Sequence, residues 1–285
     1  RRENPLFLPG VTLPASLAAT SLLEEAVEGA EVVLVVVPSE YSRRVYAELR
    51  ERVSPGAALV SATKGLEMDT LRRMTEVAAE EVPGHPVAVL SGPSFALEVA
   101  QALPTAVVAA SADHAVAQRL QRALSTRTFR VYSSEDVVGV ELAGALKNVI
   151  AIAAGIVDGL GYGHNTVAAL ITRGLAEISR LAGHLGGRPE TLAGLAGLGD
   201  LVLTCTGALS RNRRVGQGLG RGLSLAEASA GLVAEGVRTT LAACDLAGRE
   251  QVDMPISRQM KAVLHEGKPP RDALDELMLR SLKRE

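Results

Sequence analysis

The stretch EVVLVVVP, residues 31–38, decides the fold that the sequence predicts. It is a continuous run of apolar, mostly β-branched residues that ends at a proline. Such a run is typical of a strand that is buried on both faces, as in a parallel sheet. A helical pattern follows it directly, with Tyr41, Val45 and Leu49 on one face. The stretch therefore predicts the first strand and helix of an α/β domain.

The alternation of strand and helix continues to about residue 133 and then stops. Further strands are expected at AALVSA (57–62), PVAVLS (86–91), TAVVAA (105–110) and FRVYSS (129–134), and helices at 40–52, 69–81 and 115–125. Beyond this point only helical patterns are found, at 135–158, 165–185, 225–230, 239–247, 256–266 and 271–282. We therefore expect an α/β Rossmann-type domain with a largely parallel sheet over residues 1–133, and an all-helical domain over residues 134–285.

Composition excludes several classes of partner. The chain has 285 residues, of which 47% are apolar and 22% charged, and its net charge of −2 gives no general attraction to nucleic acid or to a membrane. The absence of Trp argues against a base-stacking surface. Cys205 and Cys244 show no metal-ligand spacing with histidines, so we expect reduced thiols in a cytoplasmic protein. The long apolar segment 137–160 contains charged residues, which favours a buried core helix over a membrane span.

One of those charges, Lys147, lies in the apolar run ELAGALKNVI, residues 141–150. Only five of the 30 basic residues are lysines, so Lys147 and Lys64 stand out against an arginine-rich surface. Desolvation lowers a lysine pKa, and an amine tuned toward neutrality can exchange a proton with a carbonyl or carbinol oxygen. The alternatives are a lysine paired with a buried carboxylate and a lysine that extends to water.

Three loops follow expected strands and should share the edge at which open parallel sheets bind ligands. They are PSE after Val37, TKGL with Lys64, and GPSF with Gly92 and Ser94. Gly92 allows a close approach of the backbone, and Ser94 either contacts a ligand or caps a helix. Lys64 can equally be a solvated loop lysine.

The segment GLAGLGDLVLTCTGALSRNRRVGQGLGRG, residues 194–222, combines glycines with a dense group of polar and basic side chains. Arginines beside Asn, Ser and Thr suit a phosphate, through bidentate and charge-assisted hydrogen bonds. The alternative is a solvated basic loop. Asp200 could orient a lysine or bind substrate hydroxyl groups. The residues in question are Asp200, Thr204, Ser210, Arg211, Asn212, Arg213 and Arg214.

These motifs, with NPLFLPGVTLP, SATKGLE and LVAEGV, occur in an order that resembles the bacterial NAD(P)-dependent glycerol-3-phosphate dehydrogenases over the whole chain. The resemblance implies hydride transfer between dihydroxyacetone phosphate and sn-glycerol 3-phosphate, with NAD or NADP, for phospholipid synthesis. It also implies a homodimer.

The resemblance assigns roles to particular residues. Lys147 matches the catalytic acid/base. Substrate-binding positions are Lys64, Gly92, Ser94, Asp200, Thr204, Ser210, Arg211 and Asn212. Cofactor-binding positions are Lys64, Ala96, Arg211, Val233 and Glu235. No metal is implied.

The chain departs from that family in one respect. A strand, a G-x-G-x-x-G turn and a helix are expected to receive the pyrophosphate, and this spacing does not occur. GLGYGH (159–164) and GQGLGR (216–221) come near it but follow no strand. We therefore expect the printed chain to begin after that unit. The alternatives are a related β-hydroxyacid-type dehydrogenase and a cofactor-deficient, non-catalytic fragment.

Overall fold

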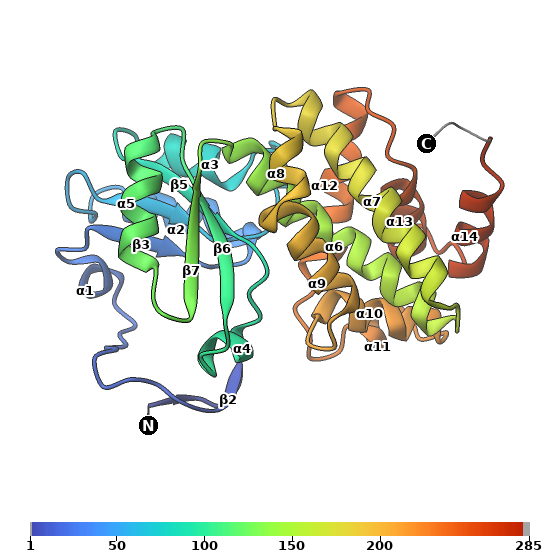
Figure 1. Cartoon of the computed structure of the whole chain (residues 1–285), viewed down its shortest axis with the longest axis horizontal. Coiled ribbons are helices and arrows are strands. Elements are labelled where there is room, and N and C mark those ends of the chain that lie inside the picture. Colours follow the sequence, from blue (N-terminus) through green and yellow to red (C-terminus); the bar gives the residue numbers. More distant parts are fainter. Residues whose placement is uncertain (1, 282–285) are drawn as a thin grey trace. The chain divides into compact units, whose positions relative to one another are not determined.

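The computed structural model describes residues 2–281, which form two compact units (Figure 1). The first unit runs to Thr63 and resumes over Met74–Val137. The second consists of Lys64–Arg73 and the chain from Val138 onward. The units thus divide a few residues after Ser133, and the second also takes a ten-residue segment, 64–73, from within the α/β region.

The first unit is built on a five-stranded sheet with the order β3-β4-β5-β6-β7. Its strands are β3 (Val32–Val35), β4 (Ala58–Ser61), β5 (Val87–Ser91), β6 (Thr105–Ala110) and β7 (Phe129–Ser134). All pairs are parallel except β5 and β6, which are antiparallel. The largely parallel sheet is therefore confirmed. The exception lies where the link between strands contains only the short helix α4 (Ala96–Ala100), which provides little length for a crossover.

Helices cover both faces of this sheet. On one face, Val33, Val35 and Leu59 pack against α2 (Ser39–Leu49) and α3 (Met74–Glu81). On the other, Val60 and Val107 belong to a cluster with α5 (His114–Leu124). Apolar residues on both sides of each strand explain why the strands read as continuous apolar runs.

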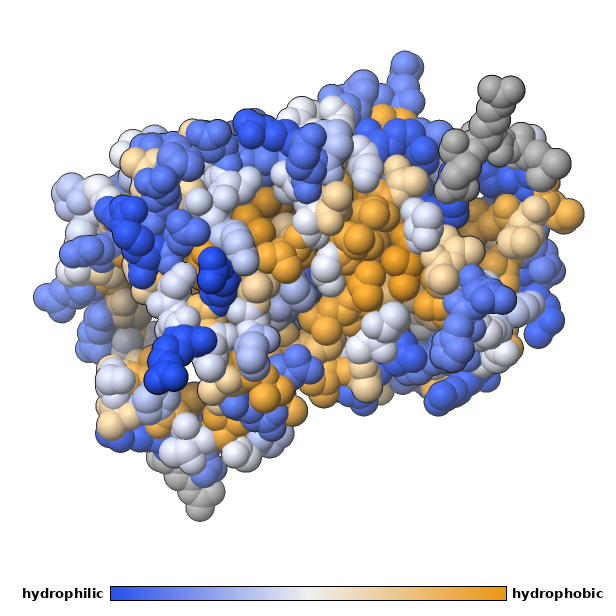
Figure 2. Space-filling view, in the orientation of Figure 1, coloured by the Kyte–Doolittle hydropathy of each residue, from blue (hydrophilic) through white to orange (hydrophobic). Residues whose placement is uncertain are grey.

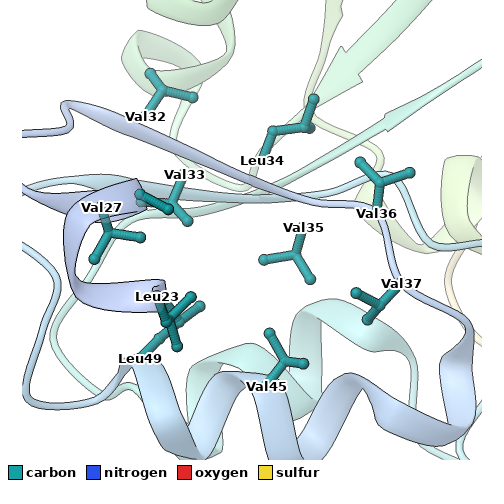
Figure 3. A pocket seen from close by; sticks show the side chains of 11 residues that line it. Leu23, Val27, Val32, Val33, Leu34, Val35, Val36, Val37, Val45 and Leu49 are labelled. Carbon is teal, nitrogen blue, oxygen red and sulfur yellow. The ribbon is translucent and has the colours of Figure 1, made fainter. Parts of the chain in front are cut away.

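The start of the chain forms a small antiparallel hairpin of β1 (Glu3–Asn4) and β2 (Leu8–Thr12), and then the short helix α1 (Leu23–Val27). β3 lies at one edge of the large sheet, and Leu34 on it is 45% exposed. An apolar pocket runs along this strand, α1 and α2, lined by Leu23, Ala26, Val27, Val32 to Val37, Val45 and Leu49 (Figure 3).

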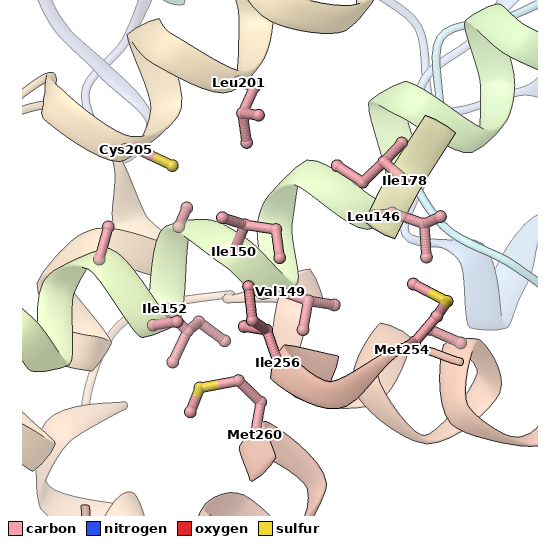
Figure 4. Close-up of a cluster of buried hydrophobic side chains, with 14 of the residues drawn as sticks. Leu146, Val149, Ile150, Ile152, Ile178, Leu201, Cys205, Met254, Ile256 and Met260 are labelled. Atoms are coloured by element: carbon pink, nitrogen blue, oxygen red, sulfur yellow. The ribbon is translucent and has the colours of Figure 1, made fainter. Parts of the chain in front are cut away.

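The second unit is helical and is organised around α6 (Val137–Gly159). Every residue of α6 from Gly139 to Val157 is buried. Its side chains meet those of α9, α7 and α13 in one large cluster (Figure 4). The surrounding helices are α7 (His164–His184), α8 (Pro189–Ala193), the π-helical turn η1 (Leu195–Gly199), α9 (Asp200–Thr206), α10 (Arg211–Gly220), α11 (Leu225–Ala228), α12 (Glu235–Arg249), α13 (Pro255–His265) and α14 (Pro270–Met278).

α6 alone among the described helices is long and apolar enough to cross a membrane, and its apolar window is entirely buried inside the structure. The expectation that residues 137–160 form a buried core helix is confirmed.

Several helices between residues 189 and 220 were not expected, because their sequence is rich in glycine, which disfavours helices on average. Packing explains their presence. Gly155 and Gly159 of α6 face α10, and Gly216 and Gly220 of α10 face α6; a Cβ atom at any of the four would collide with backbone of the other helix. The glycines of GQGLGR therefore let two helix backbones touch and form no phosphate-binding turn.

This contact yields a prediction about stability. Gly155→Ala places a methyl group against the carbonyl oxygen of Arg213, so we expect it to lower the free energy of unfolding by about 2–3 kcal/mol. Gly183→Ala in α7 is the control, because no atom lies within 4 Å of its added Cβ. It should change stability by no more than about 1 kcal/mol, in the stabilising direction. Urea unfolding measures both, and equal effects would contradict the packing argument.

Candidate functional site

Lys147 is the buried cation that the sequence singled out, and the structure shows its partners. Its ammonium donates to Asp200 Oδ1 at 2.6 Å and to Thr204 Oγ1 at 2.7 Å. Lys147 is only 5% exposed and Asp200 only 1%. The lysine therefore does not extend to water, and the alternative in which it pairs with a buried carboxylate is part of the structure.

α9 presents both partners on one face. Asp200 and Thr204 are four residues apart, which is about one helical turn. Thr204 donates its hydroxyl hydrogen to the backbone oxygen of Asp200 at 2.6 Å, so its oxygen lone pairs are left to accept from Lys147. Thr204 thus orients the amine.

Lys64 binds the other oxygen of the same carboxylate. Its ammonium lies 2.7 Å from Asp200 Oδ2, and its side chain is 24% exposed. One buried aspartate therefore holds two lysines, one enclosed and one that reaches the surface. The solvated-loop interpretation of Lys64 is wrong for this structure.

This arrangement sets the protonation of Lys147. Burial lowers the pKa of Lys147 to about 7, with a further lowering by the positive charge of Lys64 and an opposing effect of Asp200. An amine with this pKa is present in both protonation states at neutral pH, and it can therefore give or take a proton.

Glu235, the first residue of α12, lies in the field of the same charges. Burial raises its pKa to about 7, while the positive charges of Arg211, Lys64 and Lys147 lower it. The four side chains therefore belong to one electrostatic neighbourhood.

The N-terminus of α10 carries the predicted phosphate-binding group. Ser210 caps this helix by accepting from the amide of Arg213 at 3.2 Å. Asn212 accepts from the amide of Gly236 at 3.0 Å, which joins α10 to α12. Arg213 pairs with Asp158 at 3.0 Å. Arg211 is exposed, and its positive charge acts on Glu235. An exposed arginine at the positive end of a helix favours an anion.

The remaining predicted residues lie elsewhere. Gly92, Ser94 and Ala96 belong to the first unit, at the carboxyl end of β5. Gly92 has φ +144°, and a Cβ there would lie 2.9 Å from Val107 Cα, so glycine is required. Ser94 donates to the carbonyl of Gly92 at 3.1 Å and does not cap α4, whose N-cap is Phe95. Val233 is 50% exposed and precedes α12.

Sequence reasoning missed one charged pair close to the site. Arg73 Nη1 lies 2.8 Å from Glu141 Oε2, and the Glu141 side chain is 5% exposed. Glu141 carried the same signal as Lys147, a charge within an apolar helix, but no partner could be identified from spacing alone.

Within residues 2–281, no group of three or more His, Cys, Asp or Glu side chains is arranged to hold a metal ion. Both cysteines are free, and burial raises the pKa of Cys205 to about 12.

A largely parallel sheet covered on both faces, together with a helical unit that holds a buried lysine with a pKa of about 7, is typical of one class of protein, the two-unit nicotinamide-dependent dehydrogenases. Similarity to known proteins identifies the family within this class. The family described as NAD-dependent glycerol-3-phosphate dehydrogenase matches through its N-terminal part over residues 1–117 and its C-terminal part over residues 136–275. The chain belongs to this family.

Individual relatives agree. The glycerol-3-phosphate dehydrogenase [NAD(P)+] of Geobacter sulfurreducens is 56% identical over 100% of this chain and 86% of that protein. The protein of the same name from Koribacter versatilis is 56% identical over 98% of this chain and 85% of its own length. The crystal structure of glycerol-3-phosphate dehydrogenase from Coxiella burnetii has a TM-score of 0.92 and 44% identity, covering 96% of this chain and 84% of that one.

The shared carboxylate predicts opposite shifts in two variants. Because the chain has only five lysines, the Cε signal of Lys147 can be followed by NMR. The signal that is lost in Lys147→Met identifies it. Lys64→Met removes a like charge and should raise the pKa of Lys147 from about 7, whereas Asp200→Asn removes the opposite charge and should lower it. Shifts of the same sign in both variants would contradict the three-residue network.

Proposed function

We propose that this chain catalyses reversible hydride transfer between dihydroxyacetone phosphate and sn-glycerol 3-phosphate, with NAD(P) as cofactor, and so supplies glycerol phosphate for phospholipid synthesis. Membership of the family supports the reaction type. The observation that carries the mechanism is the buried Lys147 amine, held by Asp200 and Thr204 with a pKa of about 7.

In this proposal Lys147 is the acid and base. In reduction its ammonium protonates the carbonyl oxygen as that oxygen becomes an alkoxide, and in oxidation its neutral amine accepts the hydroxyl proton. Thr204 and Asp200 orient the amine. Lys64 is assigned contacts with both substrate and cofactor, and its partial exposure beside the same carboxylate supports this assignment.

The phosphate of the substrate is assigned to Arg211 and Asn212 at the start of α10, with Ser210 fixing the helix end. Asn212 uses its carbonyl oxygen on Gly236, which leaves its amide hydrogens to donate. Gly92 and Ser94 remain predicted substrate contacts in the first unit.

NAD(P)H supplies the hydride when bound. The groups assigned to it are Lys64, Ala96, Arg211, Val233 and Glu235. A cation and a carboxyl group that titrates near neutral pH suit the polar groups of a dinucleotide, and Arg211 and Glu235 are such a pair in one neighbourhood.

We also propose a cytoplasmic homodimer. The two cysteines are free thiols, as expected in a reducing compartment. Figure 2 shows apolar side chains on one face of the helical unit. Leu198 and Val202, four residues apart along η1 and α9, are also exposed, by 38% and 40%. Association of two copies would cover them. Sedimentation velocity measures the oligomeric state. Val202→Glu should favour the monomer, because it places a charge on a side chain that the second copy would cover.

Lys147 predicts a pH dependence that differs between the two directions. Reduction requires the ammonium, so its rate should fall as pH rises through about 7; oxidation requires the neutral amine, so its rate should rise over the same range. Lys147→Ala should lower kcat by at least about 100-fold, the usual contribution of an acid/base group. Rates are followed by absorbance of the reduced cofactor. Near-normal turnover in this variant would sink the assignment.

Arg211 predicts a different kinetic signature. Arg211→Ala should chiefly raise KM for the phosphate-bearing substrate, because a charge-assisted hydrogen bond to phosphate contributes about 2 kcal/mol. The matched control is Arg221→Ala, an exposed arginine at the other end of the same helix, which should leave KM unchanged. Non-phosphorylated keto acids as substrates separate this function from that of a β-hydroxyacid-type dehydrogenase. Equal saturation by phosphorylated and non-phosphorylated substrates would contradict the role of Arg211.

A further inference from the structure

The segment Lys64–Arg73 is a closed loop that packs with the helical unit, although it lies between two elements of the sheet unit in the chain. Leu66 and Arg73 form an isolated antiparallel bridge. The amide of Glu67 donates to the carbonyl of Arg72 at 2.9 Å, and the amide of Leu71 donates to the carbonyl of Glu67 at 2.9 Å. The two ends of the loop are therefore linked, and movement at one end displaces the other.

The loop is held in a conformation that its sequence does not prefer. Leu71 has φ +60°, in the left-handed region that a bulky residue rarely adopts. Contacts with the helical core compensate, since Leu66 is 2% exposed, and Met68 and Leu71 pack against the same cluster. A strained backbone of this kind persists where surrounding contacts determine the geometry.

Each end of the loop carries a cation bound to a buried carboxylate of the helical unit. Lys64 binds Asp200 of α9 at 2.7 Å. Arg73 binds Glu141 of α6 at 2.8 Å, and the side chains of Glu141 and Arg73 are 5% and 18% exposed. α6 also carries Lys147. The Arg73–Glu141 pair thus attaches the loop to the helix that bears the reactive amine.

We propose that the Arg73–Glu141 ion pair is a positioning pair that holds the loop Lys64–Arg73 on α6 and thereby keeps the Lys64 ammonium on the carboxylate of Asp200. The pair is assigned a positioning role and no part in the proton transfer. Their influence on Lys147 passes through Lys64. The consequence for turnover rests on the function proposed above, whereas the consequence for the amine itself does not.

The charges around Lys147 make this testable. The titratable groups that face it are Lys64 of the loop, Asp200 and Cys205 of α9, and Glu235 of α12. The charges found to shift the pKa of Lys147 are those of Lys64 and Asp200, and Glu141 is not among them. In this proposal Glu141 acts on the amine through the position of Lys64. Release of the loop would move the positive charge of Lys64 away from Lys147. The pKa of Lys147 should then rise.

The experiment follows the Cε signal of Lys147 by NMR in the full chain, with Lys64→Met as the reference for complete loss of the Lys64 charge. Glu141→Gln and Arg73→Met should each raise the titration midpoint toward that reference. The double variant should shift it no further than the larger single change, because both changes break one interaction. Glu250→Gln is the matched control, since it breaks an Arg–Glu pair with Arg249 elsewhere in the same unit, and it should leave the midpoint unchanged.

An unchanged midpoint in both folded single variants, or additive shifts in the double variant, would overturn the proposal. If circular dichroism shows that Glu141→Gln does not fold, the Arg73→Lys variant tests the proposal instead. It keeps both charges but loses the planar guanidinium, and it should give a smaller rise of the same sign; no rise overturns the proposal.

Kinetics separate this proposal from the proposed function. In the native chain the rate of reduction is expected to fall as the pH rises through about 7. In Glu141→Gln this fall should occur at higher pH, by the same shift as the NMR titration midpoint of Lys147. A native chain that does not reduce dihydroxyacetone phosphate, but in which Glu141→Gln still shifts the midpoint, removes the function and leaves the positioning pair in place. An active native chain with an immobile midpoint removes only the positioning pair.

Discussion

The carboxylate of Asp200 is the group on which the arrangement of the helical unit depends. It is 1% exposed and accepts from two ammonium groups, Lys147 at 2.6 Å and Lys64 at 2.7 Å. A buried charge is costly unless it is paired, and a buried lysine is costly for the same reason. The two lysines share the carboxylate unequally, because only Lys147 is enclosed. Burial then lowers the pKa of that one amine to about 7.

The surrounding helices serve to bring these groups together. α6 is buried over nearly its whole length, so Lys147 is shielded from most of the solvent and is only 5% exposed. α9 places Asp200 and Thr204 one turn apart on the face toward Lys147. The glycine contacts between α6 and α10 pack α10, whose first residue is Arg211, against α6. The buried amine of Lys147 and the N-terminus of α10 therefore belong to one helical core.

The loop Lys64–Arg73 shows how a residue of one chain segment becomes part of another unit. It begins three residues after strand β4 ends at Ser61, yet its apolar residues pack into the helical core. The α3 helix accordingly begins at Met74, whereas periodicity predicted a start near residue 69. The sequence from residue 69 has helical periodicity, but residues 69–73 do not join the helix. The tertiary contacts of Leu66, Met68 and Leu71 outweigh the local helix propensity there.

Sequence alone determined the sheet strands, most of the long helices and the identity of Lys147 as an unusual charge, because uninterrupted apolar runs and a cation within one of them are local signals. Tertiary structure decided what spacing cannot express. It showed that Asp200, rather than another carboxylate, pairs with Lys147, and that Ser210 caps a helix. It also showed that the glycines of residues 216–220 pack against α6. Partners that lie 53 or 136 residues apart meet only when helices pack, and packing depends on side-chain volume across the whole unit.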